Sequence, residues 1–325
     1  MRTYTIYPTV FPEPWASDWG EDEYGLWMGF TYKGVKQFFR WIEPGTFLMG
    51  SPANEPERWE NEGQHSVTLS QGFWLADCCV TLALWQAAMG NNPSYFKGDD
   101  RPVEQVSWKD AQNFISKLNG LKPELKLCLP TEAQWEYAGR AGTQTPFSFG
   151  EQIDASQVNF DGTVPYNNGK KSEYREQTVA VRSLPPNPWG LYEMHGNVLE
   201  WCQDWYGDYP SQAVTDPRGP ASGYFRVLRG GSWRHYGRIY RSANRLYYEP
   251  DDAYNYIGFR LARGHEHSQA GSGAGQQPAG THAAVARGGQ AGDGLQTTGV
   301  RQTSKKSSAK KQKNLFDNVK DLFKK

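Results

Sequence analysis

The residues best equipped to contact another molecule lie between Arg226 and Gly264. This stretch is crowded with Tyr, His, Arg, Asp and Asn and has neither helical nor strand periodicity. Tyrosines offer a large contact area and a hydrogen bond at little cost in rotamer entropy, so clusters of them are typical of recognition surfaces. An aromatic-rich loop that packs against its own domain would have a similar composition. The stretch therefore allows two interpretations, a binding surface and a buried loop.

Other residues of the same stretch are of the kind that builds a framework. Gly230 and Gly231 fit where side chains cannot, Trp233 can fill a core, and Pro250 favours a turn. Gly258 to Arg260 lead into a last strand. The positions between this framework are the candidate ligand-binding residues: Arg234, His235, Tyr236, Ile239, Tyr240, Leu246, Tyr247, Tyr248, Asp252, Ala253, Tyr254, Asn255 and Tyr256.

The sulfur and imidazole groups do not form a recognisable reactive site. The four cysteines are Cys78, Cys79, Cys128 and Cys202, and the adjacent pair cannot readily form a disulfide. Neither the cysteines nor the six histidines have the spacing of a metal site. This pattern favours a reduced, cytoplasmic setting over a secreted disulfide framework.

Composition sets further limits. The chain has 35 basic and 35 acidic residues, so its charge gives no indication of nucleic acid or membrane binding. It contains no apolar run of transmembrane length, and its first residues lack the apolar segment of a signal peptide. We therefore expect a cytoplasmic protein, with export by an unrecognised route left open. Its 325 residues, 38% of them hydrophobic, can bury one sizeable core or two.

The elements that must position these residues are short. Between Leu26 and Ile42, apolar and polar residues roughly alternate, which predicts two strands joined by a turn at Lys33-Gly34. Further strands are expected at residues 66–69 and 73–80. Capping residues followed by apolar residues at helical spacing predict three helices, which begin after Thr81, Ser107 and Thr131 and cover residues 82–89, 108–118 and 132–138.

Several separated motifs give the chain a family resemblance. Met49-Gly50-Ser51, Arg101-Pro102-Val103, Pro130 to Glu136, Gly190-Leu191-Tyr192 and Gly196 to Trp201 resemble, in the same order, motifs of formylglycine-generating-enzyme-like domains. The resemblance runs from about Trp41 to Arg263. It implies an α+β, C-type-lectin-like fold of the formylglycine-generating-enzyme subtype, irregular, with short antiparallel strands and few helices.

The framework after Arg226 also resembles the variable repeat of bacterial or phage proteins that are diversified by diversity-generating retroelements. In those proteins an error-prone reverse transcriptase randomises adenines in Asn-type codons. Every candidate ligand-binding residue given above is reachable from an Asn codon by changing adenines alone. Lys, Glu, Gln, Met and Trp are not reachable and do not occur at those positions. Glu249, which is not reachable, lies beside Pro250 and would belong to the framework.

The resemblance also bears on catalysis. The enzymes of the family oxidise a substrate cysteine with a copper-binding pair of cysteines in the segment after the Gly-Gly-Ser-Trp motif. Here the corresponding segment, which follows Trp233, contains no cysteine. Soft sulfur ligands are what a Cu(I) site needs, so we expect no copper and no formylglycine-generating activity. A related branch uses non-haem iron, and a metal-dependent oxidase stays the alternative.

Calcium is the ion that the family places in its loops, and it prefers carboxylate and carbonyl oxygens. By motif match, one structural site would use the side chains of Glu193 and Glu200 with the carbonyls of Gly196 and Val198. A second would use Asn159 and Glu173 with the carbonyls of Phe160 and Arg175. Glu193 stands where the family usually has Asn. Alternatively, Glu193 and Glu200 are surface acids or partners of nearby arginines.

The sequence divides into four regions. Residues 1–40 form a predicted hairpin extension packed on the main domain, and residues 41–264 form that domain, with its variable segment at 230–260. Residues 265–304 are too poor in large apolar side chains to fold and form a predicted disordered linker. Residues 305–325 predict a basic amphipathic helix that would dock to a partner groove or an anionic surface, or a frayed end.

These observations together predict a non-catalytic, receptor-like binding protein. The tyrosines of the variable segment would supply contact area and the polar residues specificity, toward a protein or other macromolecular ligand that is not a nucleic acid. The alternative is a sulfatase-modifying-factor-like or other metal-dependent oxidase.

Overall fold

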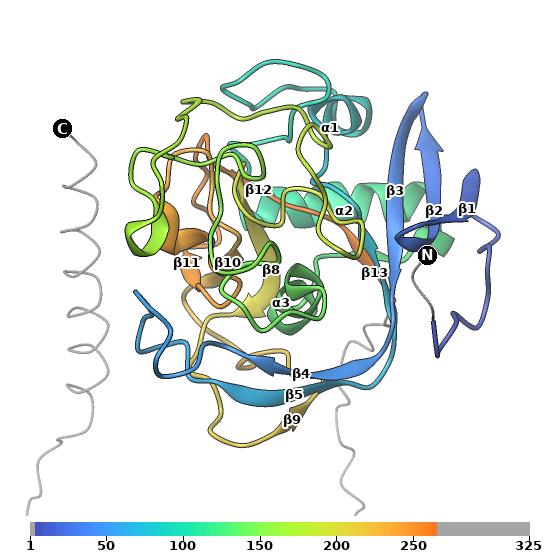
Figure 1. Cartoon of the computed structure of the whole chain (residues 1–325). Coiled ribbons are helices and arrows are strands. Elements are labelled where there is room, and N and C mark those ends of the chain that lie inside the picture. Colours follow the sequence, from blue (N-terminus) through green and yellow to red (C-terminus); the bar gives the residue numbers. More distant parts are fainter. Residues whose placement is uncertain (1–3, 265–325) are drawn as a thin grey trace, which may run out of the picture. The chain divides into compact units, whose positions relative to one another are not determined.

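The computed structural model describes residues 4–264. The predicted linker at 265–304 and the predicted tail helix at 305–325 lie outside the described residues. The described part is an α+β fold with three α-helices and three small, mostly antiparallel sheets (Figure 1). Within it, no helix is long and apolar enough to cross a membrane.

The largest sheet has six strands in the order β1-β2-β3-β6-β13-β7. The predicted hairpin is confirmed, because β2 and β3 pair from Trp27↔Arg40 to Tyr32↔Val35. Its two-residue turn, Lys33-Gly34, has positive φ angles of 46° and 83°, as tight hairpin turns require. β3 also pairs with β6, so the N-terminal extension continues the sheet of the main domain. The strands are β1 (Asp18–Asp22), β2 (Gly25–Tyr32), β3 (Val35–Ile42), β6 (Phe73–Ala76), β13 (Ala262–Arg263) and β7 (Leu127–Cys128).

The three predicted helices are confirmed, each with its predicted cap. Thr81, Ser107 and Thr131 accept hydrogen bonds from backbone amides in the first turns of α1 (Leu82–Met89), α2 (Trp108–Leu121) and α3 (Glu132–Arg140). α2 continues past its predicted end at Leu118 to Leu121; the amide of Lys122 donates to the carbonyl of Leu118, and Pro123 follows.

A second sheet, in the order β11-β10-β8-β12, includes two short strands of the candidate segment, β11 and β12. Its strands are β11 (Leu246–Tyr248), β10 (Arg226–Arg229), β8 (Leu199–Trp205) and β12 (Ile257–Gly258), and a third sheet contains β4 (Gly45–Met49), β5 (His65–Leu69) and β9 (Val214–Thr215). Neighbouring residues of a strand point to opposite faces of its sheet. Trp201 and Leu228 accordingly belong to one hydrophobic core, and Cys202 and Val227 belong to another. The second sheet is therefore buried on both faces.

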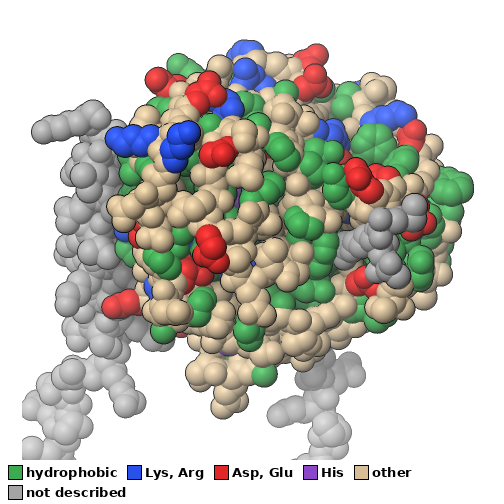
Figure 2. All heavy atoms as spheres, viewed as in Figure 1, with side chains coloured by type: hydrophobic (Ala, Val, Ile, Leu, Met, Phe, Trp, Pro, Cys, Tyr) green, Lys and Arg blue, Asp and Glu red, His purple; other side chains and the backbone are tan. Residues whose placement is uncertain are grey.

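One face of the molecule shows the balance of charges in the composition. On the face shown in Figure 2, acidic and basic side chains are interspersed among apolar and neutral ones. This face carries no extended patch of a single charge.

Candidate functional site

Buried arginines attach the candidate segment to the rest of the domain. Arg241 donates to both carboxylate oxygens of Glu62, over 2.6 and 2.7 Å. Arg245 holds Glu132 in the same two-pronged way, over 2.6 and 2.8 Å. Arg229 pairs with Glu136, and Arg260 pairs with Glu200. Leaving one member of such a buried pair without its partner costs about 3–5 kcal/mol, so these contacts fix the path of the chain between the candidate residues.

The glycines of the framework are required by geometry. Gly230 and Gly231 have φ angles of 94° and 77°, in a region that favours glycine. A Cβ atom on Gly231 would lie 2.4 Å from the ring of Tyr240. The turn into the variable segment is therefore closed to other residues.

Three candidate tyrosines form a cluster on one face of the second sheet. The rings of Tyr254 and Tyr256 are stacked at 5.2 Å, and Tyr248 lies 5.4 Å from Tyr254. The hydroxyls of Tyr248 and Tyr256 are 3.2 Å apart, and the guanidinium of Arg234 lies 5.0 Å from the centre of the Tyr256 ring. Tyr248 and Tyr254 are partly exposed, as is Leu246 on the same face. We call Tyr248, Tyr254 and Tyr256 the tyrosine cluster.

Tyr247 is separated from this cluster by the period of the strand. Because it lies between Leu246 and Tyr248 in β11, its side chain points to the opposite face. There its ring lies 4.1 Å from that of Tyr206 and 5.0 Å from that of Phe225. Burial raises the pKa of Tyr247 to about 12. The structure therefore does not place Tyr247 and Tyr248 on one contact surface.

Tyr236 lies in a third place, near the loop between β4 and β5. Its hydroxyl is 3.4 Å from a guanidinium nitrogen of Arg238. The guanidinium carbon of Arg238 also lies 4.2 Å from the centre of the Trp59 ring. Tyr236 is partly exposed.

The structure contradicts the prediction that every candidate residue is available to a ligand. The side chain of Tyr240 is fully buried, packs 5.3 Å from Phe160, and donates its hydroxyl to the carbonyl of Ser232. His235 and Ile239 are buried as well, and burial lowers the pKa of His235 to about 3, so this imidazole is neutral. Tyr256 is only 9% exposed and mainly supports Tyr254. The partly or fully exposed candidates near the cluster are Arg234, Asp252, Ala253 and Asn255.

The first predicted calcium set does not fit the ion as proposed. Both oxygens of Glu200 accept hydrogen bonds from Arg260, and one also accepts from Trp135. A guanidinium thus occupies the place of the predicted cation, as the alternative interpretation of Glu200 held. Gly196 and Val198 adjoin this region, and the amide of Gly196 donates to Gly230.

Glu193 is in a different situation from Glu200. Its carboxylate is buried, and within residues 4–264 neither oxygen accepts a hydrogen bond of normal geometry. Burial raises its pKa to about 7, against the lowering effect of the nearby backbone of Arg182. A carboxylate in these surroundings fits a cation or a proton, and calcium at Glu193 stays a prediction.

The second predicted calcium set is loosely assembled. The Asn159 side-chain oxygen is buried and lacks a donor within the described chain, which fits a cation ligand. Glu173, however, is largely exposed and pairs with Arg175 at 3.2 Å, and the Phe160 carbonyl accepts from the amide of Gly162. In the part of the chain that the structure describes, no group of three His, Cys, Asp or Glu side chains could hold a metal ion.

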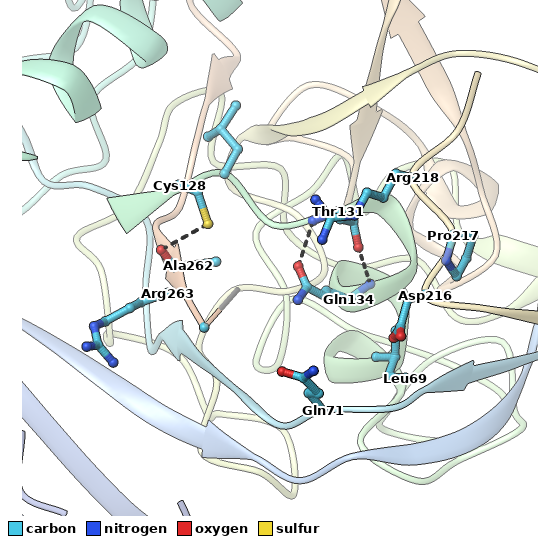
Figure 3. A pocket seen from close by; sticks show the side chains of 12 residues that line it. Leu69, Gln71, Cys128, Thr131, Gln134, Asp216, Pro217, Arg218, Ala262 and Arg263 are labelled. Atoms are coloured by element: carbon cyan, nitrogen blue, oxygen red, sulfur yellow. Dashed lines mark hydrogen bonds between the residues drawn. The ribbon is translucent and has the colours of Figure 1, made fainter. Parts of the chain in front are cut away.

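The cysteines are poor nucleophiles. All four are free, and burial raises the pKa of each thiol well above its usual range, to about 12 for Cys128. Cys128 lines a cavity of about 20 Å³ together with Thr131, Gln134 and Arg218 (Figure 3). A cavity of this size holds about one water molecule. This cavity is therefore too small for an organic substrate. Cys128 also lines a second, more open hollow of about 490 Å³ with Gln112 and Gln203, so the case against a reactive thiol rests on its raised pKa.

Sequence reasoning missed the fixed aromatic residues around the candidate segment. Trp233 lies between Phe96, at 5.3 Å, and Tyr174, at 6.3 Å. Arg226 is enclosed by Trp108 and Trp205, which lie 3.7 and 3.4 Å from its guanidinium carbon. These partners are distant in the sequence, so the chain offered no local signal for them.

Comparisons with known proteins agree on the fold. The model of the sulfatase-modifying factor enzyme 1-like domain matches residues 36–265. The chain is 33% identical over 210 residues to the formylglycine-generating enzyme of Mus musculus, covering 62% of this chain and 54% of that protein. It is 40% identical over 177 residues to the serine/threonine-protein kinase pkn1 of Chlamydia caviae, covering 53% of this chain and 25% of the kinase. The chain thus spans about half of the first relative and a quarter of the second.

Two solved structures are similar over nearly their whole length. Treponema denticola variable protein 1 has a TM-score of 0.63 and 29% identity, covering 73% of this chain and 98% of that one. PvdO from Pseudomonas aeruginosa has a TM-score of 0.59 and 26% identity, covering 76% and 98%. The predicted α+β, C-type-lectin-like fold of the formylglycine-generating-enzyme type is confirmed, as is the resemblance to a variable protein.

Proposed function

Since the chain belongs to the sulfatase-modifying factor enzyme 1-like domain family, we propose that it is a non-catalytic, ligand-binding member of it. Its segment at 230–260 presents exchangeable side chains to a protein or other macromolecular ligand. The observation that carries this proposal is that some residues of the segment hold it in place while others are exposed. Buried arginines with carboxylate partners alternate with partly exposed residues around the tyrosine cluster.

The geometry supports a ligand-binding surface because the residues that hold the backbone are different from those that are exposed to a ligand. Arg241, Arg245 and Arg260 hold the backbone without using any candidate side chain. Exchange of Asp252, Ala253 or Asn255 would leave these ion pairs intact. Surface substitutions away from buried contacts typically change stability by no more than about 0.5 kcal/mol. The surface can therefore vary while the fold persists.

The codon pattern and the likeness to a variable protein support diversification of this segment. The buried candidates limit it, because Tyr240 and His235 have fixed packing partners. We expect tolerated variation to concentrate at the partly exposed positions. A near-copy of the segment in the genome that differs from it only at adenine positions would be direct evidence of this diversification.

The chemistry of the thiols supports a non-catalytic role. No cysteine lies in the segment after Trp233, and Gly237 has no room for a side chain, since a Cβ there would lie 2.0 Å from the amide nitrogen of Tyr166. The alternative, a metal-dependent oxidase, is favoured by the identity to the formylglycine-generating enzyme. Copper or iron in the purified chain, together with turnover of a cysteine-containing peptide, would establish that alternative.

The test is a pair of libraries displayed on yeast. In the first, codons able to encode the residues reachable from Asn replace positions 234, 236 and 252–255; in the second, they replace the buried positions 235, 239 and 240. Both are selected for binding to an arbitrary folded protein such as lysozyme. We expect folded binders from the first library and mostly unfolded chains from the second. A first library that folds but never yields a binder would contradict the proposal.

A further inference from the structure

Arg226 is a fixed residue placed directly beside the tyrosine cluster. It begins β10, where it pairs with Trp205 of β8 on one side and with Tyr248 of β11 on the other. Directly opposed residues in a sheet project their side chains to the same face. The indoles of Trp205 and of Trp108, the first residue of α2, cover the two faces of the Arg226 guanidinium. Arg226, both tryptophans and Tyr248 are all partly exposed.

The positive charge of Arg226 is not neutralised within the described chain. Arg229, three residues further along the same strand, pairs with Glu136, whereas no carboxylate of residues 4–264 lies within ion-pair distance of Arg226. Its one hydrogen bond there runs from Nη1 to the carbonyl of Gln203, over 2.7 Å, and its Nε–H is buried without an acceptor. The nearby Asp204 is buried and accepts from the amide of Glu132. Burial lowers the pKa of Arg226 to about 10, and Asp204 only partly opposes this.

The two indoles determine how a ligand could reach this charge. They cover both faces of the guanidinium, so an anion must approach at its edge and in its plane. Because Nε is buried, a ligand would reach the edge at its Nη end, where a planar carboxylate could accept N–H bonds from Nη1 and Nη2 in one plane. Because the two indoles already hold the Arg226 guanidinium in place, less conformational entropy is lost when it binds a ligand. The arrangement is suited to a carboxylate more than to a diffuse anionic surface.

We propose that Arg226 is a constant contact residue of the binding face and takes a carboxylate group of the partner protein beside Tyr248. The inference rests on the proposed function of the tyrosine cluster. The inference adds to that function a recognition residue that precedes the variable segment and stays constant when the segment varies. Every variant of the surface would then share one preference for an acidic side chain or a terminal carboxylate.

The test uses the full chain labelled with ¹⁵N and follows the Nε–H signal of Arg226, assigned by its loss in Arg226→Lys. Sodium acetate, sodium phosphate and sodium chloride are titrated at constant ionic strength, with tryptophan fluorescence as a second readout. We expect a saturable shift with acetate, absent with chloride and weaker with phosphate. The same titration of Arg238→Lys, which alters an arginine that covers Trp59, should leave the Arg226 response unchanged.

Two results would overturn the inference: equal responses to acetate and chloride, or saturation by phosphate alone. Circular dichroism of both variants establishes that they fold. The acetate response should also survive in Tyr254→Ala. Loss of the Arg226 response with library binding intact would remove this contact and leave the display function standing. An intact Arg226 response together with a library that yields no binders would instead contradict the proposed function and leave this contact standing.

Discussion

Arg260 donates two hydrogen bonds of 2.6 Å to the two carboxylate oxygens of Glu200, and both side chains are fully buried. The pair joins the chain just after β12 to β8 of the second sheet. It also explains why a motif that predicted a calcium ligand holds a guanidinium here.

This pair should behave as a buried structural ion pair. Arg260→Met leaves the Glu200 carboxylate buried without its cation, so we expect a loss of about 3–5 kcal/mol in the free energy of unfolding. The double variant Arg260→Met/Glu200→Leu should be less destabilised than the sum of the single changes, because no charge remains buried. Urea denaturation measures all three. Additive losses would show that the two residues do not act as a pair.

Two tyrosines of the segment should differ sharply in their contribution to stability. Tyr240→Ala empties a fully buried position, and large aromatic truncations of this kind cost about 3–5 kcal/mol. Tyr254→Ala removes a partly exposed ring, and we expect a cost of about 1 kcal/mol or less. Equal losses by chemical denaturation would contradict the division between framework and display residues.

Glu193 should make stability depend on pH in an unusual direction. Its pKa is raised to about 7 in the folded chain, from 4.5. The folded state therefore binds more protons than the unfolded state between these values, and its stability falls as the pH rises from about 4.5 to 7. Glu193→Gln should remove this part of the slope. Because burial also raises the pKa values of Glu104 and Asp204 to about 7, the informative quantity is the difference between wild type and variant. Identical slopes would contradict the assignment.

If calcium binds at Glu193, it must compete with that proton. Added Ca²⁺ should then raise the melting temperature more at pH 8 than at pH 5, since a ligand that binds the folded state stabilises it by mass action. Glu193→Gln should abolish the effect, whereas the matched variant Glu173→Gln tests the second predicted set. A calcium effect that is unchanged in both variants would place the ion elsewhere.

The parts of the fold that follow from local chemistry could be predicted from the sequence. Caps such as Ser107 and the positive φ angles of Lys33-Gly34 are set by neighbouring residues, and the structure has them where the sequence indicated. The burial of Tyr240 could not be predicted in this way. It depends on Phe160, eighty positions earlier, and on the closure of the turn at Gly231.

The candidate site was predictable as a segment but not as a surface. In a strand as short as β11, alternation cannot be recognised from three residues, so the separation of Tyr247 from Tyr248 was hidden. Likewise, the carboxylates that hold Arg241 and Arg245 lie more than a hundred residues away. Long-range pairs of this kind leave no periodic signature in the sequence.

The most direct test of the display function is made on one lysozyme binder from the first library. Its exchanged positions are returned to the native residues, and its affinity and melting temperature are measured side by side. We expect the affinity to fall by about a hundredfold or more, while the melting temperature changes by no more than about 2–4 °C. A melting temperature that falls in step with the affinity would show that these side chains belong to the core, and it would contradict the account.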